Sequence, residues 1–290
     1  MKYKLFNTKP KRIFTFGCSF TGYNWATWAN ILGEEFQECE FYNYGQSGAG
    51  NVYISNMVTQ ADCVHNFTDD DLVIVNWTNV SREDRYSEKK EEWIRSGNIY
   101  SQDVFSEVFV KNWANETHYR MRDYSLISLV YNLLKNKTQF HFFSMLNLKD
   151  FGDQWKSEAS IKTKQEKTLD ILYKDYLSKI KPSMYEVLWN NNLQDKMEND
   201  MKIIHPNFRD GHPLPTEHLE YLQRMFDYTF SSDTVVKVQN LTNDLISFLR
   251  ENIDLENNEC SIHHLSNENS TKLIEDFSLR KGKRSTQVVY

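Results

Sequence analysis

Apolar residues occur along the chain in two patterns, as short continuous runs and as longer stretches with an apolar residue every three or four positions. Short runs bounded by turn-forming residues predict buried strands, and the longer spacing predicts amphipathic helices. We expect strands near residues 12–17, 40–44, 72–77, 139–145 and 201–204. We expect helices near residues 25–36, 52–64, 124–134, 216–226 and 237–251. The alternation predicts a three-layer α/β/α fold with a parallel sheet of about five strands.

Three segments do not fit this alternation. Residues 82–120 and 150–200 are charged and too long for ordinary connections, so we interpret them as insertions in one domain that spans residues 1–255. We expect the second insertion to be mainly helical. We expect the first insertion to form a lid over the end of the third strand. Residues 256–290 are interpreted as a C-terminal extension that is flexible or binds a partner, either another copy or an assembly component. Its basic cluster at residues 280–284 is interpreted as a solvated tail.

Composition narrows the function classes. The 290 residues include 34 Lys and Arg against 40 Asp and Glu, and the net charge of −6 argues against nucleic-acid binding. We see no membrane-spanning run and no secretory signal, so we expect no membrane partner and a cytoplasmic location, or a virion if the chain is phage-encoded. The cysteines lack metal-ligand spacing, so we expect free thiols, no metal and no cofactor. They are Cys18, Cys39, Cys63 and Cys260.

The end of the first apolar run, Gly17-Cys18-Ser19, has the strongest chemical signal. A serine at the carboxyl end of a parallel strand lies where α/β sheets bind ligands, and the expected helix would place an N-terminus beside it. Ser19 is therefore a candidate nucleophile. The alternative is that Ser19 caps that helix, as serine often does. Glycines cluster in the turns after the first two strands, which indicates backbone that approaches a ligand or has positive φ.

Polar groups follow later strands in the same way. They are Asn43-Tyr44-Gly45-Gln46-Ser47-Gly48, Thr78-Asn79 and Asp210-Gly211-His212-Pro213. With the Gly-x-Ser of the first strand and in this order, they resemble the four sequence blocks of the SGNH or GDSL hydrolase family. The ending Trp77-Thr78-Asn79 is similar to a branch that is frequent in phage and marine-microbe genomes.

The resemblance implies a flavodoxin-like fold and assigns roles to residues. Ser19 matches the nucleophile, His212 the base and Asp210 the acid that orients the base. The oxyanion donors would be the N–H groups of Ser19 and Gly48 and the side-chain amide of Asn79. Residues beside these blocks would contact the substrate, namely Phe20, Asn51, Trp77 and Arg82.

Some positions depart from the family pattern. Cys18 replaces an aspartate, but this position is not the nucleophile, so the change is compatible with catalysis. Val80 replaces the aspartate after Asn79, and the usual glycine before Asn79 is missing, which weakens its assignment. Asp210 and His212 are two residues apart, where three is commoner. Asp-Gly-His-Pro alone could be a turn, and His205 and His218 are alternative bases.

These residue types belong together in acyl transfer. A serine hydroxyl becomes a good nucleophile when an imidazole takes its proton, and a carboxylate fixes the imidazole tautomer. We therefore expect a serine esterase that forms an acyl-serine intermediate, with an O-acetyl carbohydrate as a candidate substrate. An acyltransferase is its chemical neighbour. The alternative is a catalytically silent binding or structural module of the same fold, such as a phage particle component.

Overall fold

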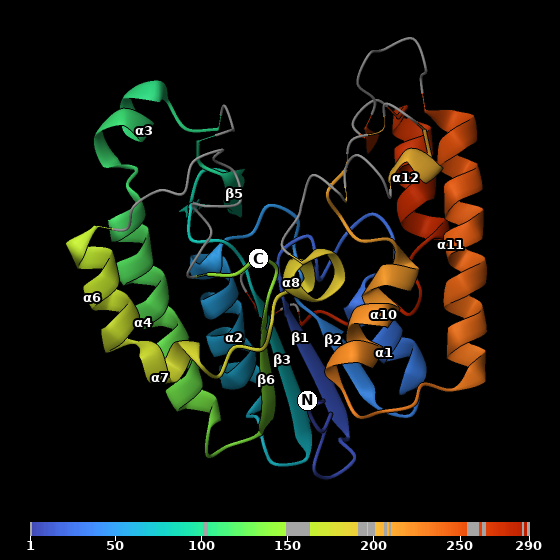
Figure 1. The fold of residues 1–290 in the computed structure, drawn as a ribbon, viewed down its shortest axis with the longest axis horizontal. Helices are drawn as coiled ribbons and strands as arrows, with labels where there is room; N and C mark the ends of the chain where they lie inside the picture. The colour runs from blue at the N-terminus through green and yellow to red at the C-terminus, as the bar shows by residue number, and fades with distance from the viewer. Residues whose placement is uncertain are drawn as a thin grey trace.

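A parallel sheet forms the centre of the protein in the computed structural model (Figure 1). The structure describes residues 2–100, 104–148, 163–190, 196, 201–205, 208, 210–253, 261–262, 265–285 and 287–288. Within this part of the chain the sheet has four strands in the order β2-β1-β3-β6. They are β1 (Arg12–Gly17), β2 (Glu40–Asn43), β3 (Asp71–Trp77) and β6 (Gln139–Ser144).

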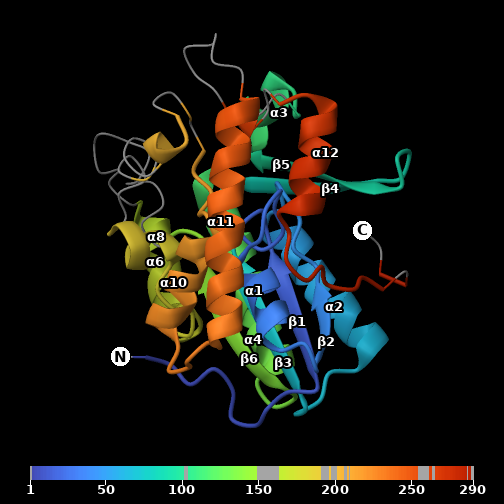
Figure 2. The ribbon, with the colours of Figure 1, turned by 90° about the vertical axis from the view of Figure 1, so that its right-hand side faces the viewer.

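Helices cover both faces of this sheet, which confirms the predicted three-layer α/β/α fold. Helices α2 (Asn51–His65) and α4 (Glu116–Leu134) lie on one face (Figure 1). Helices α1 (Trp28–Glu35), α10 (Pro215–Met225) and α11 (Ser232–Asn252) pack together on the other (Figure 2). Strand β3 is buried along its whole length, as its continuous apolar run predicts for a central parallel strand.

The prediction of a fifth strand at residues 201–204 was wrong. Residues Met201–Ile203 form a short 3₁₀ helix, and Met201 and Ile204 are buried in an apolar cluster with residues of α11. Their apolar character therefore serves helix packing. Single bridges extend the sheet edges instead, from Ile180 to Phe142 in β6 and from Lys283 to Tyr42 in β2. Covered edges prevent the exposed strands from pairing with other chains.

The first insertion forms a β-hairpin of β4 (Arg82–Ser87) and β5 (Glu92–Asn98), followed by helix α3 (Glu107–Trp113). The hairpin lies across the carboxyl end of the sheet (Figure 2), where the Gly97 N–H donates to the Gly48 carbonyl at 3.1 Å. Helix α4 begins at Glu116, with Asn115 as its N-cap, so the helix expected from residue 124 starts inside the predicted insertion. The hairpin thus contacts the glycine-rich loop after β2.

The second insertion contains three helices in its described residues, while 149–162, 191–195 and 197–200 lie outside them. The helices are α6 (Lys164–Leu172), α7 (Lys174–Leu177) and α8 (Met184–Trp189). Helices α6 and α7 pack on α4, and α8 packs on α10. The helical prediction is confirmed for these residues.

The C-terminal extension is packed on the domain in its described part. Helix α12 (Asn267–Asp276) places Leu273 in the apolar cluster that also contains residues of α11. Arg280 donates to the carbonyls of Gly33, Phe36 and Cys39 at the C-terminal end of α1, where a cation is favoured. Arg284 donates to the carbonyls of Asn43 and Gly45. The interpretation of residues 280–284 as a solvated tail was therefore wrong, because Arg280 fixes this segment to the end of α1 and Arg284 fixes it to the end of β2.

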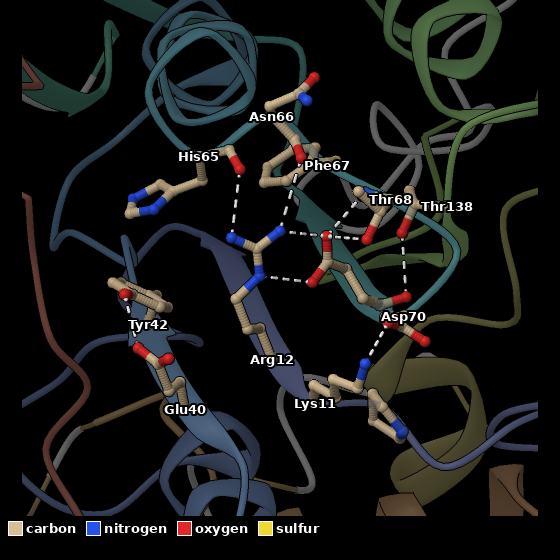
Figure 3. A network of polar contacts seen from close by, with 12 residues as sticks. Lys11, Arg12, Glu40, Tyr42, His65, Asn66, Phe67, Thr68, Asp70 and Thr138 are labelled. Atoms are coloured by element: carbon tan, nitrogen blue, oxygen red, sulfur yellow. Dashed lines mark hydrogen bonds and ion pairs between the residues drawn. The ribbon is translucent and has the colours of Figure 1, made fainter.

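The amino edge of the sheet carries a polar network (Figure 3). Arg12 and Asp71 are register partners on β1 and β3, and two guanidinium nitrogens donate to the two carboxylate oxygens at 2.7 Å each. The Thr68 N–H donates to Asp71 as well. The Asp71 hydrogen bonds raise the pKa of the Arg12 guanidinium, so the pair stays charged.

No helix in the described part of the chain is long and apolar enough to cross a membrane.

Candidate active site

A tight turn after β1 presents Ser19. The N–H groups of Thr21 and Gly22 donate to the Cys18 carbonyl at 2.9 and 3.1 Å. A Cβ on Gly17 would lie 2.1 Å from Thr21 Oγ1, so a side chain there would collide with the turn. Helix α1 begins only at Trp28 and has Thr27 as its N-cap, so Ser19 caps no helix. For the same reason, the expected helix N-terminus directly beside Ser19 was wrong.

The structure brings Ser19, His212 and Asp210 together in one relay. Ser19 Oγ lies 2.8 Å from His212 Nε2, and His212 Nδ1 lies 2.6 Å from Asp210 Oδ1. A carboxylate only accepts, so Nδ1 carries the hydrogen and Nε2 is left to accept from the Ser19 hydroxyl. The His212 backbone N–H also donates to Asp210 Oδ1 at 2.7 Å. This turn explains how a spacing of two residues still places the carboxylate against the imidazole.

The Asp210 carboxylate is kept in its charged form. Burial by itself raises the pKa of the Asp210 carboxyl, but the neighbouring His212 and the hydrogen bonds from His212 and Tyr23 outweigh burial. The net pKa lies below its ordinary value. Asp210 can therefore orient the imidazole and balance its charge across the neutral pH range.

Aromatic side chains that the sequence reasoning missed support this relay. The ring of Tyr23 stacks on His212 at 3.7 Å, and its hydroxyl donates to Asp210 Oδ2 at 2.8 Å. Trp25 donates from its indole N–H to the Pro213 carbonyl at 2.8 Å, and the Tyr185 hydroxyl donates to the Gly211 carbonyl. Both carbonyls belong to the loop that carries His212. The position of Tyr23 in the turn after Ser19 was the one available sequence signal.

The alternative base His218 lies on the far side of Phe20. It is buried, and its ring packs edge-on against Phe20, which in turn packs against His212 with ring centres 5.2 Å apart. Burial and the nearby His212 and Lys196 lower the pKa of His218 well below its ordinary value. His218 is therefore a neutral core histidine, whereas His212 is the imidazole that meets Ser19.

The glycine-rich loop after β2 lies against this strand end. The Gln46 N–H donates to the Gly17 carbonyl at 3.0 Å. Gly48 has a φ of +76°, and a Cβ there would lie 2.9 Å from the Arg95 carbonyl oxygen of the hairpin. Positive φ and close packing together require glycine at this position. Among the described residues, neither the Gly48 N–H nor the Ser19 N–H donates to a protein acceptor.

The hairpin also caps helix α2. Asp84 accepts from the Gly50 N–H at 2.8 Å and from the Tyr53 N–H at 2.9 Å, which satisfies two free donors of the helix N-terminus. Burial raises the pKa of the Asp84 carboxyl, although both N–H groups favour its charged form. A Cβ on Gly50 would lie 2.6 Å from Asp84 Oδ2, so glycine is needed there. The N-terminus of α2 is thus occupied by a protein carboxylate.

The third strand end places Asn79 in a fixed orientation. Asn79 Oδ1 accepts from the Ser81 N–H at 3.1 Å, and no acceptor in the described part of the chain bonds to Asn79 Nδ2. Asn51 holds the preceding residue, because it accepts from the Thr78 N–H at 3.0 Å and donates to the Thr78 carbonyl at 3.1 Å. Asn51 also donates to Asp123 at 2.8 Å. Both hydrogens of the Asn79 side-chain NH2 group therefore remain available to donate.

The four predicted substrate contacts lie inside the protein. Asn51 and Trp77 are fully buried, and Trp77 packs edge-on against Phe142. Arg82 is 8% exposed and donates to the Ala49 carbonyl at 2.8 Å. Phe20 is 4% exposed and packs against His212. Asn51 and Arg82 hydrogen-bond to internal carbonyls, which holds the strand-end loops in place. Direct contact of the four side chains with a substrate stays a prediction.

Cys18 packs in the hydrophobic core. Its thiol is fully buried and lies 3.8 Å from Met145 Sδ. This packing agrees with the interpretation that Cys18 is no rival nucleophile. The described residues contain no group of three or more His, Cys, Asp and Glu side chains with an arrangement that could hold a metal ion.

Neither a protein-family model nor a curated protein matches this sequence. Among solved structures, the chain is similar to a GDSL-like lipase from Bacteroides thetaiotaomicron, with 16% identity, coverage of 74% of this chain and 85% of that one, and a TM-score of 0.39. It is also similar to a member of the lipolytic protein G-D-S-L family from Veillonella parvula, with 12% identity, coverage of 73% and 94%, and a TM-score of 0.40.

Proposed function

We propose that this protein is a serine ester hydrolase of the SGNH type, with Ser19 as nucleophile, His212 as general base and Asp210 as the orienting acid. The observation that carries the proposal is the continuous relay from Ser19 Oγ through His212 Nε2 and Nδ1 to Asp210 Oδ1, with distances of 2.8 and 2.6 Å. The relay joins two segments far apart in the sequence, the turn after β1 and the loop before α10. A nucleophile, a base and an orienting carboxylate in contact are typical of acyl transfer.

In the first half-reaction, Ser19 Oγ attacks the ester carbonyl carbon while His212 Nε2 takes the hydroxyl proton. The tetrahedral intermediate collapses, the bond to the alcohol oxygen breaks, and His212 returns the proton to the departing alcohol. In the second half-reaction, water loses a proton to His212 and attacks the acyl-serine carbon. Ser19 Oγ then leaves and regains the proton, which releases the carboxylic acid. Asp210 stays ionised and balances the imidazolium in both halves.

The oxyanion donors in this proposal are the N–H groups of Ser19 and Gly48 and Asn79 Nδ2. Support comes from their lack of acceptors among the described residues, since unpaired donors at a strand end are available to a developing negative charge. Asn51, through Thr78, fixes the backbone that carries Asn79. The missing glycine and aspartate beside Asn79 are compatible with this role, because the Asn79 amide is still free to donate.

We assign a short acyl group and a hydroxyl-rich alcohol to the substrate. Ser19 is only 5% exposed and aromatic rings surround the relay, which favours a small acyl group such as acetyl. Tyr23 also lines a neighbouring cavity of about 370 Å³, which Lys281 and Arg284 line together with a group of amides and hydroxyls. They include Asn24, Asn30, Asn43, Gln46, Ser47 and Ser278. Such groups hydrogen-bond to sugar hydroxyls, which favours an O-acetylated carbohydrate.

The test is p-nitrophenyl acetate hydrolysis by the full chain. We expect Ser19→Ala to lower kcat by at least about a thousandfold, because the nucleophile is lost. Ser247→Ala, at an exposed serine on α11 whose hydroxyl donates to the Asn243 carbonyl of the same helix, is the matched control and should retain activity. A fluorophosphonate probe should label wild type at Ser19 and leave Ser19→Ala unlabelled. Equal hydrolysis by wild type and Ser19→Ala, together with no labelling, would instead favour a silent binding or structural module.

A further inference from the structure

Tyr23 contacts both partners of the Asp210–His212 pair. Its hydroxyl donates to Asp210 Oδ2 at 2.8 Å while its ring lies parallel to the imidazole, 3.7 Å away and tilted by 18°. We propose that Tyr23 is the positioning residue of this relay, which sets the plane of His212 with its ring and the basicity of Asp210 with its hydroxyl. The inference rests on the proposed function, and it extends that function to a residue with no counterpart in the four blocks.

The hydroxyl completes the hydrogen bonding of the buried carboxylate. Asp210 Oδ1 accepts both bonds from His212, and Tyr23 is the donor to Oδ2 among the described residues. Without Tyr23, Oδ2 would be left without a protein partner inside the site. A buried carboxylate oxygen that has no hydrogen-bond donor binds a proton more readily. The Tyr23 hydroxyl therefore keeps Asp210 a charged acceptor that points at His212 Nδ1.

The ring limits how the imidazole can turn. The Tyr23 ring stacks on one face of the His212 imidazole. The Phe20 ring packs against the same imidazole with a ring-centre distance of 5.2 Å and a tilt of 45°. Trp25 stands edge-on to Tyr23 at 4.6 Å, so Tyr23 is itself held in place. A rotation of His212 about its side chain would break the contact between Nε2 and Ser19. Fixed aromatic neighbours therefore keep the reacting atoms in place before substrate arrives.

The charge around the relay decides the direction of the pH effect. The titratable groups around the pair are Tyr23, Tyr185 and His218, and the Lys196–Glu217 ion pair lies near Tyr185 and His218. His218 and both tyrosines stay neutral near pH 7, because burial lowers the pKa of His218 and raises the pKa of Tyr23 and Tyr185. Removing the Tyr23 hydroxyl takes away a bond that favours ionised Asp210. Asp210 then attracts protons more strongly, so activity should be lost at a higher pH on the acid side.

The experiment compares wild type with Tyr23→Phe, Tyr23→Leu and Tyr228→Phe over a range of pH. Tyr228→Phe is the matched control, since its hydroxyl also donates to a carboxylate, Glu35, at 2.8 Å. We expect Tyr23→Phe to lower kcat by roughly three- to tenfold with KM nearly unchanged and to move the acid limb of kcat/KM to higher pH. Tyr23→Leu should lower kcat by a further factor of about ten, because the imidazole is no longer clamped. Tyr228→Phe should leave kcat and the acid limb unchanged.

A second readout does not depend on turnover. Nitrogen NMR of the His212 ring should show a fixed Nδ1–H tautomer in wild type and Tyr23→Phe, and tautomer averaging in Tyr23→Leu. Identical ring spectra in all three proteins, or an acid limb in Tyr23→Phe that matches Tyr228→Phe, would overturn the proposal. If wild type fails to hydrolyse esters but the ring spectra change as expected, the proposed function fails while the positioning by Tyr23 stands.

Discussion

Two histidines in this protein have both ring nitrogens hydrogen-bonded, yet their partners have opposite charges. His141 on β6 donates from Nε2 to the Leu5 carbonyl at 2.6 Å and accepts at Nδ1 from the Lys181 ammonium at 2.9 Å. His212 faces the Asp210 carboxylate at Nδ1 and the Ser19 hydroxyl at Nε2. Burial, together with the neighbouring Lys181 charge, lowers the pKa of His141 to about 3.

The difference shows how partner charge decides what a partly buried imidazole can do. A second proton on His141 would lie beside an ammonium group, so that ring stays neutral and serves as a structural link between β6 and the N-terminal segment. A proton taken by His212 would be balanced by a carboxylate that the site keeps ionised. The hydroxyl at Nε2 is then the source of that proton. One ring is therefore a structural acceptor, and the other has the surroundings of a general base.

Replacing the Asp210 carboxylate that faces His212 should have the largest effect on activity. In Asp210→Asn, the amide cannot accept and balance charge as a carboxylate does, so the wrong tautomer is favoured and the imidazolium loses its partner. We expect kcat to fall by about ten-thousandfold. Ester hydrolysis measures this loss, and a thermal melt checks that the variant folds. A folded Asp210→Asn protein with wild-type kcat would show that the His212 partner charge is unimportant.

Weakening the oxyanion site should have an intermediate effect. The charge on His212 appears together with the negative charge on the substrate oxygen, so Asn79→Ala should lower kcat by about 10²–10³-fold. KM should change little because the lost bond forms mainly in the transition state. Asn56→Ala is a control on α2, where the side chain only contacts the Val52 carbonyl. Equal kcat values for the two variants would remove Asn79 from the proposed site.

The neutral state of His141 should make the stability of the protein depend on pH. The pKa of His141 is about 3 in the folded protein and near 6.5 when the ring is free, so between these values the unfolded chain binds a proton that the folded chain does not. The free energy of unfolding should therefore fall as the pH drops below about 6.5, by up to about 1.4 kcal/mol per pH unit from this group.

Urea unfolding of wild type and His141→Gln at several pH values measures this contribution. The variant should have a shallower pH slope between pH 6 and 4.5 and unchanged kcat. His118→Gln, at an exposed histidine on α4, should keep the wild-type slope. If His141→Gln and wild type have the same slope, His141 takes up protons equally in both states, and the contrast with His212 is lost.

The sequence by itself determined the central layers and the strand ends. Continuous apolar runs at β1, β3 and β6 and helical spacing at α2 and α10 depend only on local periodicity, which is why those elements were predicted correctly. The order of polar groups after the strands also identified Ser19, Asp210 and His212 as candidate residues of one site. Carboxyl ends of parallel strands meet at one edge of a sheet, so the convergence of their loops follows from topology alone.

Tertiary structure decided the contacts that no local pattern encodes. Residues 201–204 have strand-like composition but pack as a 3₁₀ helix because α11 offers an apolar surface. Asn51 and Arg82 adjoin the chemical blocks, yet both are buried and hydrogen-bond to internal carbonyls. Tyr23 could be linked to Asp210 only when the turn after β1 and the loop before α10 were folded against each other. Ser19 is thus marked by its strand, while its geometry with His212 comes from packing between segments 193 residues apart.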